Sequence, residues 1–422
     1  MLPIKRNDWA TFLLCWFAFS LSLPRYVVAS AIVAAAIYVL WRIARCTPDV
    51  ARILQGVRRP EVLKAAPLPQ LLLFLAVLAG LLPFSTNAIY SLAYFLHSSA
   101  CLTVFLMLVG LKELPPHRHW TRLVIHSLLL GNTVAAMWGI YEVYRTRHLY
   151  VTGFEPTPVH APYGSLLVTA ILTAMSLLLA ARGPLRRAAY FSVVCICGVA
   201  LVCSQARGPW LALAASFPMI VYLSRQRLAR NRRRAFLSLG AAAALALALS
   251  PLYVGHALTI FDPKWEPNSE RVLIWKSTLH MIQDRPLTGV GEGLFATVYN
   301  AHYISRASAE GFHPHAHNSY LMILAEDGII GFLPFLYLLW GIGNFLRSAL
   351  RDNPSSPYII ATAGVFCSLL INSLVDHFLF SGHLWSEWIF WLMLGLVYYD
   401  RPVPGPVTVR DAASCPGECI LA

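Results

Sequence analysis

Long apolar runs follow one another through almost the whole chain, with short polar connections between them. A helix needs roughly 20 mostly apolar residues to cross the hydrocarbon core of a bilayer. About twelve runs reach or approach that length, at 9–23, 26–45, 67–83, 88–111, 121–144, 161–181, 187–203, 208–224, 235–254, 328–346, 357–376 and 384–399. Charged residues make up only 13% of the chain, which is about half their share in soluble domains. We therefore predict an all-α integral membrane protein with about twelve transmembrane helices.

The first two runs allow more than one interpretation. Pro24 and Arg25 divide a stretch that could instead form one long helix. Residues 1–23 also resemble a signal peptide, but no small-residue cleavage site follows promptly and the apolar run resumes at Tyr26. We interpret the two runs as uncleaved membrane spans.

Basic residues are distributed unevenly between the two sides of this set of spans. With the N-terminus taken as cytoplasmic, 24 of the 33 Lys and Arg residues fall on that side and 9 fall on the other. Because cytoplasmic loops are enriched in Lys and Arg, both termini are predicted to be cytoplasmic. The basic run RQRLARNRRR at 225–234 then serves as a topology anchor. No nucleic-acid partner is expected, and membrane lipids are the expected surroundings.

The spans divide the chain into four predicted parts. Residues 1–254 carry spans one to nine, and residues 255–327 form an insert on the outer side. Residues 328–400 carry the last three spans, and residues 401–422 form a tail that is predicted to be disordered. An insert of this length exceeds a simple connection, so we expect it to carry the function.

Two motifs occupy the first part of the insert. SERVLIWKSTLHMI (269–282) has helical periodicity, with Ser269 as the expected N-cap, and is too short to span a bilayer. It suits a helix lying at the membrane surface. PLTGVGEGLF (286–295) resembles part of a dinucleotide-binding fingerprint, but no strand–turn–helix unit precedes it. Its glycines are instead expected to form a tight turn where the backbone approaches another element or a ligand.

Three histidines stand at two-residue spacing in HPHAHNSY (313–320). They could ligate a metal from a loop, since Pro314 argues against a helix there, or they could be structural. A third alternative makes His317 a general base, because neutral imidazole near pH 7 can take a proton from a hydroxyl. We favour the general base, with its ring oriented by Asn318 or Asp376, and we predict no metal.

Ionisable side chains recur at the predicted outer ends of the spans. Arg207 lies between spans seven and eight, Arg271 lies on the surface helix, and Asp376 closes span eleven. Arg207 could snorkel to the lipid headgroups, but the rule that enriches cytoplasmic loops does not explain arginines on the outer side. Two converging guanidinium groups would suit a diphosphate, because they bind phosphate oxygens in bidentate fashion and keep their charge.

These motifs together resemble the O-antigen ligase/polymerase superfamily of polytopic bacterial glycosyltransferases, and in particular the O-antigen ligases. The family pattern of an Arg, a Trp and P-L-x-G-x-G-x-G-x-F is matched by Arg271, Trp275, Pro286, Leu287, Gly289, Gly291, Gly293 and Phe295. The pattern H-N-S/T-x-L, followed by E-x-G-I/L-x-G, is matched by His317, Asn318, Ser319, Leu321, Glu326, Gly328 and Gly331.

The resemblance implies a GT-C-like enzyme of the bacterial inner membrane with its active site at the periplasmic face. The donor would be a glycan on undecaprenyl pyrophosphate and the acceptor a lipid A–core sugar, with inverting transfer and no cofactor. Arg207 and Arg271 match the two diphosphate-binding arginines of that family, and His317 matches the residue that activates the acceptor hydroxyl. Supporting roles are expected of five further residues: Asn318, His315, Asp376, Trp275 and Tyr320.

Three alternatives to the ligase stay open at this point. An O-antigen polymerase and a protein O-oligosaccharyltransferase would use the same donor and differ in the acceptor. A transporter of lipid-linked sugars would also have about twelve spans, but its polar groups would lie at the membrane midplane in paired halves. The roles of His313 and His315 are not assigned by the sequence.

Overall fold

The computed structural model describes residues 8–44, 67–111, 120–154, 160–230, 254–380 and 385–401. These residues form helices and connecting loops without any strand, so the predicted all-α class is confirmed for this part of the chain. The N-terminal helices are α1 (Asp8–Ser20), α2 (Arg25–Ala44), α5 (Leu68–Leu81), α6 (Ala88–Ser98), α7 (Leu102–Leu111), α8 (Trp120–Thr146), α9 (His160–Ala180) and α10 (Pro184–Ser204). The later helices are α11 (Arg207–Leu223), α12 (Arg225–Arg230), α14 (Glu266–Asp284), α15 (Phe295–His302), α16 (Ser319–Asp352), α17 (Pro357–Asn372) and α18 (Trp385–Asp400).

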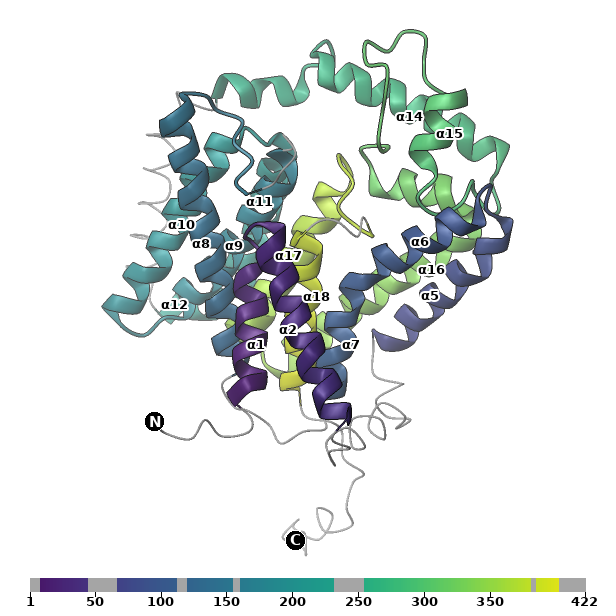
Figure 1. Cartoon of the computed structure of the whole chain (residues 1–422). Helices are drawn as coiled ribbons and strands as arrows, with labels where there is room; N and C mark the ends of the chain where they lie inside the picture. The colour runs from purple at the N-terminus through teal and green to yellow at the C-terminus, as the bar shows by residue number, and fades with distance from the viewer. Residues whose placement is uncertain are drawn as a thin grey trace, which may run out of the picture.

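The helices form one bundle with a cap at one end. Helices α8 to α12 stand on one side of Figure 1 and α5, α6 and α16 on the other, with α17 and α18 between them. The middle helices join the two sides, since α17 packs on α9 and α11 of one side and on α16 of the other, and α18 packs on α7 and α9. Helices α14 and α15 lie at the upper end of the bundle in this view (Figure 1).

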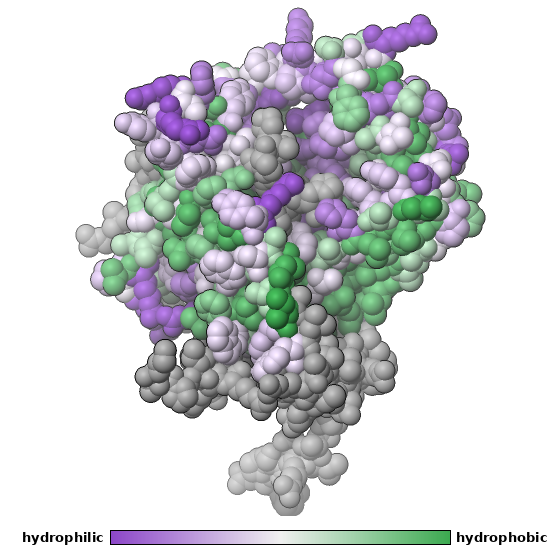
Figure 2. All heavy atoms as spheres, viewed as in Figure 1, coloured by the Kyte–Doolittle hydropathy of each residue, from purple (hydrophilic) through white to green (hydrophobic). Residues whose placement is uncertain are grey.

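Within the described residues, five helical segments are long and apolar enough to cross a membrane: Ala88–Val109, Trp120–Thr146, His160–Ala180, Pro184–Ser204 and Ser319–Asp352. Four shorter apolar helices accompany them: Trp9–Ser20, Arg25–Ala35, Leu68–Phe84 and Pro357–Asn372. Figure 2 shows hydrophobic residues gathered in a band across the middle of the molecule and hydrophilic residues at the upper end. The predicted span 235–254 and the predicted tail after Arg401 lie outside the described residues, and the total of about twelve spans stays a prediction.

The structure decides between alternatives at two helix boundaries. The first apolar stretch forms two helices, because α1 ends at Ser20 and α2 begins at Arg25. The surface helix begins earlier than predicted, and Trp265, not Ser269, occupies its N-cap position. The predicted cap is wrong because Pro267 enters the first turn, where its missing N–H costs no helical hydrogen bond.

The glycine-rich loop packs its backbone against a break in α16. Gly328 interrupts that helix with a φ of 61° and a ψ of −168°. A Cβ built on Gly289 would lie 2.2 Å from the carbonyl oxygen of Glu326, and one built on Gly328 would lie 2.2 Å from that of Leu287. Both glycines have a positive φ, a backbone angle that residues other than glycine rarely adopt. The expected tight turn at a close backbone approach is therefore confirmed.

Two buried acidic side chains also hold the glycine-rich loop in place through hydrogen bonds. Glu292 accepts a hydrogen bond from the Ser98 hydroxyl at 3.1 Å, which ties the loop to α6. Glu326 accepts one from the backbone N–H of Phe295 at 2.9 Å, which ties α16 to the start of α15. Burial raises the pKa of Glu292 to about 7, although its hydrogen bonds from Ser98 and Asp327 oppose the shift.

Candidate active site

The cap of the bundle brings two predicted arginines to one cavity. Arg207 is the first residue of α11, and Arg271 lies on α14 one helical turn before Trp275, so that Arg271 and Trp275 share a face. All three side chains line a cavity of about 240 Å³, together with Asn268 and Val375. The convergence predicted for Arg207 and Arg271 is thus present in the structure.

Neutral groups hold the Arg207 side chain in place. Its Nη1 donates to the carbonyl oxygen of Thr259 at 3.2 Å and to the Thr259 hydroxyl at 3.0 Å. Its guanidinium carbon lies 5.9 Å from the centre of the Trp265 ring, within the range of a cation–π contact. Neither contact neutralises the arginine, so its positive charge is available to a ligand in the cavity.

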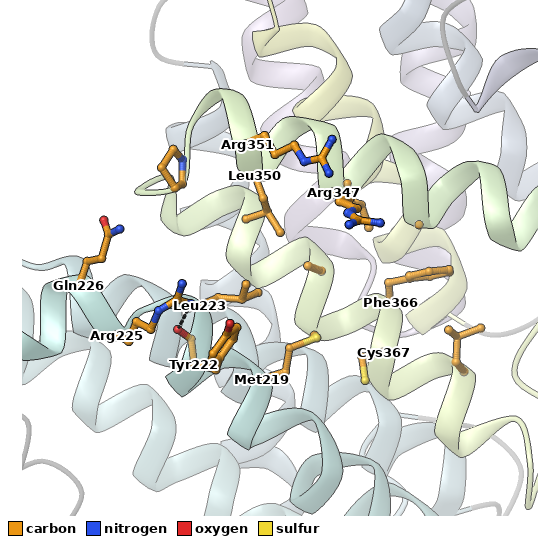
Figure 3. A pocket seen from close by; sticks show the side chains of 15 residues that line it. Met219, Tyr222, Leu223, Arg225, Gln226, Arg347, Leu350, Arg351, Phe366 and Cys367 are labelled. Carbon is orange, nitrogen blue, oxygen red and sulfur yellow. Dashed lines mark hydrogen bonds between the residues drawn. The ribbon is translucent and has the colours of Figure 1, made fainter.

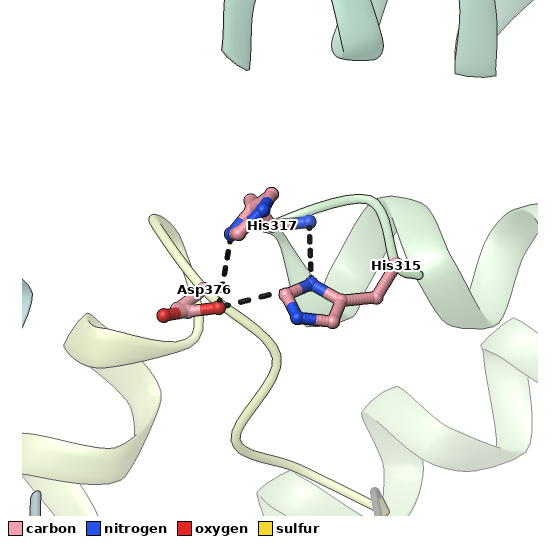
Figure 4. A group of neighbouring side chains, drawn as sticks. All are labelled: His315, His317 and Asp376. Carbon is pink, nitrogen blue, oxygen red and sulfur yellow. Dashed lines mark hydrogen bonds and ion pairs between the residues drawn. The ribbon is translucent and has the colours of Figure 1, made fainter. Parts of the chain in front are cut away.

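His317 and Asp376 form a hydrogen-bonded pair at the end of α17 (Figure 4). His317 Nδ1 lies 3.2 Å from Asp376 Oδ1, and His315 Nδ1 lies 3.8 Å from the same oxygen. The rings of His315 and His317 meet edge to face at 4.2 Å between centroids. His317 has a φ of 48°, a left-handed conformation that non-glycine residues seldom adopt.

Asp376 remains ionised in this arrangement. Burial alone would raise the pKa of its carboxyl, but the hydrogen bond with His317 and the charges of His317, His315 and Arg271 hold that pKa well below its usual range. An ionised carboxylate accepts a hydrogen bond from the Nδ1–H group of an imidazole. With Nδ1 in that role, the Nε2 atom of His317 is left to accept a proton from a substrate.

The histidine pair adjoins the arginine cavity through two neighbouring residues. Trp275, which lines the cavity, donates its indole N–H to the carbonyl oxygen of Ala316 at 3.0 Å. Val375, which also lines the cavity, immediately precedes Asp376. The cationic cavity and the His317–Asp376 pair therefore belong to one site.

Asn318 and Tyr320 do not hydrogen-bond to the His317 ring, although the sequence allowed both to support it. Asn318 is the N-cap of α16, and its Oδ1 accepts from the backbone N–H of Tyr320 at 2.9 Å and of Leu321 at 3.0 Å. Asp376, rather than Asn318, contacts the His317 ring. The Tyr320 hydroxyl donates to the carbonyl oxygen of Leu370 at 3.1 Å, so this side chain packs along α17.

His313 is separate from the other two histidines. Its side chain is fully buried, with Nε2 3.0 Å from the Ser308 hydroxyl and 3.9 Å from Glu270. Glu270 also accepts hydrogen bonds from the Ser308 hydroxyl and from the Ala309 N–H, each at 2.7 Å. His313 therefore anchors the loop before the active site to α14.

Ser319 is a positioning residue that the sequence did not single out beyond its place in the motif. Its fully buried hydroxyl accepts hydrogen bonds from the N–H groups of Phe378 at 2.9 Å and Leu379 at 3.2 Å. Its own N–H donates to the carbonyl oxygen of Ser373 at 2.9 Å. These bonds fix the loop that carries Asp376, and only the H-N-S/T pattern hints at them.

His315, His317 and Asp376 together have the composition of a small metal site. One ligand atom each from His315, His317 and Asp376 lies within 4.8 Å of the others, which is close enough to surround an ion. His313 is not part of that group. The three-histidine metal set that the spacing suggested is thus not assembled in the described residues, and a different trio of possible ligands takes its place.

Comparison with known proteins agrees with the motifs. Residues 191–336 match the family model described as O-antigen ligase. The matched stretch contains both arginines of the cavity and His317, and the predicted resemblance to this family is confirmed. No curated protein matches the chain. The family match supports a membrane glycosyltransferase of the O-antigen ligase or polymerase type that uses a lipid-linked glycan donor.

Proposed function

We propose that this chain, with its O-antigen ligase segment at residues 191–336, transfers a glycan from undecaprenyl pyrophosphate to a sugar hydroxyl of lipid A–core. The site faces the periplasm in this proposal, with both termini in the cytoplasm. One observation carries the proposal: Arg207 and Arg271 line a single cavity that adjoins the His317–Asp376 pair. A fixed double positive charge beside a general base suits the displacement of a diphosphate by a hydroxyl.

The reaction follows from the placement of these groups. His317 Nε2 takes the proton of the acceptor hydroxyl, and the hydroxyl oxygen attacks the anomeric carbon of the donor sugar. The bond between that carbon and the pyrophosphate oxygen breaks, and undecaprenyl pyrophosphate leaves with the electron pair. Attack opposite the leaving group inverts the anomeric configuration. Arg207 and Arg271 stabilise the negative charge that grows on the pyrophosphate, while Asp376 stabilises the imidazolium of His317.

Complementation of a strain that lacks its own ligase tests the assignment. His317→Ala is expected to abolish the O-antigen ladder on lipopolysaccharide gels while purified protein still binds the lipid-linked donor. Arg271→Ala is expected to weaken donor binding and transfer together. Arg285→Ala is the matched control, because Arg285 follows the same helix but is exposed and does not line the cavity. A normal ladder from either active-site variant would refute the proposed roles.

The metal alternative is tested on the same protein. Transfer by the purified enzyme is expected to continue after treatment with a chelator, and elemental analysis of the active protein is expected to find no stoichiometric metal. A metal bound one to one, with activity lost on chelation and restored on addition of the ion, would replace His317 as base by a ligand role for His315, His317 and Asp376.

The acceptor is the part of the proposal that the shared motifs specify least. An O-antigen polymerase would extend a second lipid-linked glycan, and a protein O-oligosaccharyltransferase would modify a Ser or Thr hydroxyl. Labelled donor offered to membranes that contain all three acceptors is expected to label lipid A–core. Label in longer lipid-linked glycan or in protein would keep the chemistry and change the acceptor.

A further inference from the structure

A second and larger cavity lies at the opposite end of the bundle from the arginine site. It occupies about 720 Å³ between the end of α11 and α12, the last turns of α16, and α17 (Figure 3). Helix α11 carries Arg207 as its first residue, and Arg225 follows its last turn. Seventeen residues of helix, roughly 25 Å, separate the two positions. The groove is therefore a different place from the active site.

The floor of the groove is apolar. Met219 of α11, Leu346 of α16 and Phe366, Cys367 and Leu370 of α17 line it. Figure 3 shows Phe366 and Cys367 on one helix facing Met219 on another. A surface of this kind between membrane helices accommodates a hydrocarbon chain at no cost in polar desolvation.

The rim of the groove carries three arginines and no acid among the described residues that line it. Arg225 comes from α12, whereas Arg347 and Arg351 come from the end of α16, and all three are exposed. Arg225 stacks on the ring of Tyr222 at 4.1 Å, which holds it at the groove. The neighbouring carboxylate of Asp352 is paired with Arg401.

We propose that this groove binds one anionic glycerophospholipid, with its phosphate at Arg225, Arg347 and Arg351 and an acyl chain along the apolar floor. Basic pockets between transmembrane helices on the cytoplasmic side are suited to anionic headgroups, and the positive-inside rule assigns this arginine-rich end to the cytoplasm. A role in topology explains why the arginines lie on this side. It does not explain why arginines from two distant segments meet above one apolar cavity.

A matched pair of double variants tests the proposal in the purified full-length protein. Arg347→Gln/Arg351→Gln removes two charges from the rim. Arg182→Gln/Arg186→Gln removes two exposed charges from the loop after α9 and the first turn of α10, and neither of these residues lines the groove. Binding of phosphatidylglycerol is measured by native mass spectrometry. The rim variant is expected to bind roughly 30-fold more weakly, and the loop variant is expected to bind as the wild type does.

A third variant fills the groove without changing its charge. A Cβ on Gly343 would meet only Phe366, at 4.0 Å, so Gly343→Leu is compatible with the helix and directs bulk into the groove. It is expected to exclude the lipid while the melting temperature stays within a few degrees of the wild type. Equal loss of binding in the rim and loop variants would overturn the proposal. Equal binding of phosphatidylcholine, or full binding by Gly343→Leu, would overturn it as well.

Discussion

Replacement of Asp376 by Asn separates the orientation of the base from the binding of the donor. The change keeps the shape of the side chain and removes its negative charge. His317 Nδ1 then loses a charged acceptor at 3.2 Å, and the imidazolium formed during transfer loses its counter-ion. The proposed mechanism predicts a slower chemical step. It also predicts undiminished donor binding, because the lost charge is negative and lies near Arg271.

The size of the effect follows from the strength of the hydrogen bond. A hydrogen bond to a charged group contributes about 1.5–3 kcal/mol, and about 1.4 kcal/mol corresponds to a tenfold change in rate. The transfer rate is therefore expected to fall by roughly 10- to 150-fold. The side chains of His317 and Asp376 are 27% and 14% exposed, so solvent screening places the expected value toward the lower end.

Single-turnover transfer of labelled glycan by purified protein measures the rate of the chemical step. Equilibrium binding of the lipid-linked donor measures the donor affinity. Asp352→Asn is the matched control, since it makes the same change on an exposed residue at the far end of α16. A normal transfer rate for Asp376→Asn, in a background where His317→Ala is inactive, would show that the base acts without its carboxylate. Weaker donor binding would show that Asp376 contributes to the pyrophosphate site.

Three further predictions concern the elements that support the site. Gly289→Ala is expected to lower the melting temperature and slow transfer, because its Cβ would lie 2.2 Å from the Glu326 carbonyl oxygen at a φ of 65°. Thermal unfolding measures the first effect and the transfer assay measures the second. An unchanged melting temperature would contradict the close packing. Ser319→Ala is expected to cost about 2 kcal/mol or more, since two N–H groups of the loop 373–380 lose their acceptor; a loss below about 0.5 kcal/mol in denaturant unfolding would contradict this. Glu292 has a folded-state pKa of about 7, above the ordinary 4.5, so its ionisation destabilises the fold as pH rises from about 4.5 through 7. Glu292→Gln is accordingly expected to melt higher than the wild type at pH 8 and equally at pH 4.5, and a gain of the same size at both pH values would contradict the titration.

The sequence predicts the helices well because a membrane leaves few options for the backbone. Every buried N–H and C=O group in a bilayer must be paired within the protein, so a long apolar run is helical. The expected span 161–181 appears as α9 (His160–Ala180), and the expected span 384–399 as α18 (Trp385–Asp400). The sequence misplaces the start of α14 because a proline in the first turn and a serine cap are both good helix beginnings. The residues packed around them decide between the two.

The site was predictable in its residue types and only partly in its geometry. The sequence pairs the two arginines because both are positive charges on the side predicted to face outward, and the structure places them at one cavity. The three histidines, in contrast, are equivalent by spacing alone. What separates His313 from His317 is that its partners are Glu270 and Ser308, whereas His317 meets Asp376. Glu270 and Asp376 come from segments distant in the sequence, and no local pattern carries that information.

In the proposed mechanism, the motif residues of this chain divide into those that contact the substrates and those that hold the first group at the right distances from one another. The glycine loop fixes α16 at its break, α16 begins at the turn that presents His317, and Trp275 connects this turn to the helix that bears Arg271. An error of about 1 Å in the placement of reacting groups can reduce a rate by about a hundredfold. A methyl group added at Gly289 and the loss of the imidazole at 317 should thus both impair transfer, but only the first should also shift thermal stability. That difference distinguishes the two kinds of residue by experiment, although the sequence motif contains both.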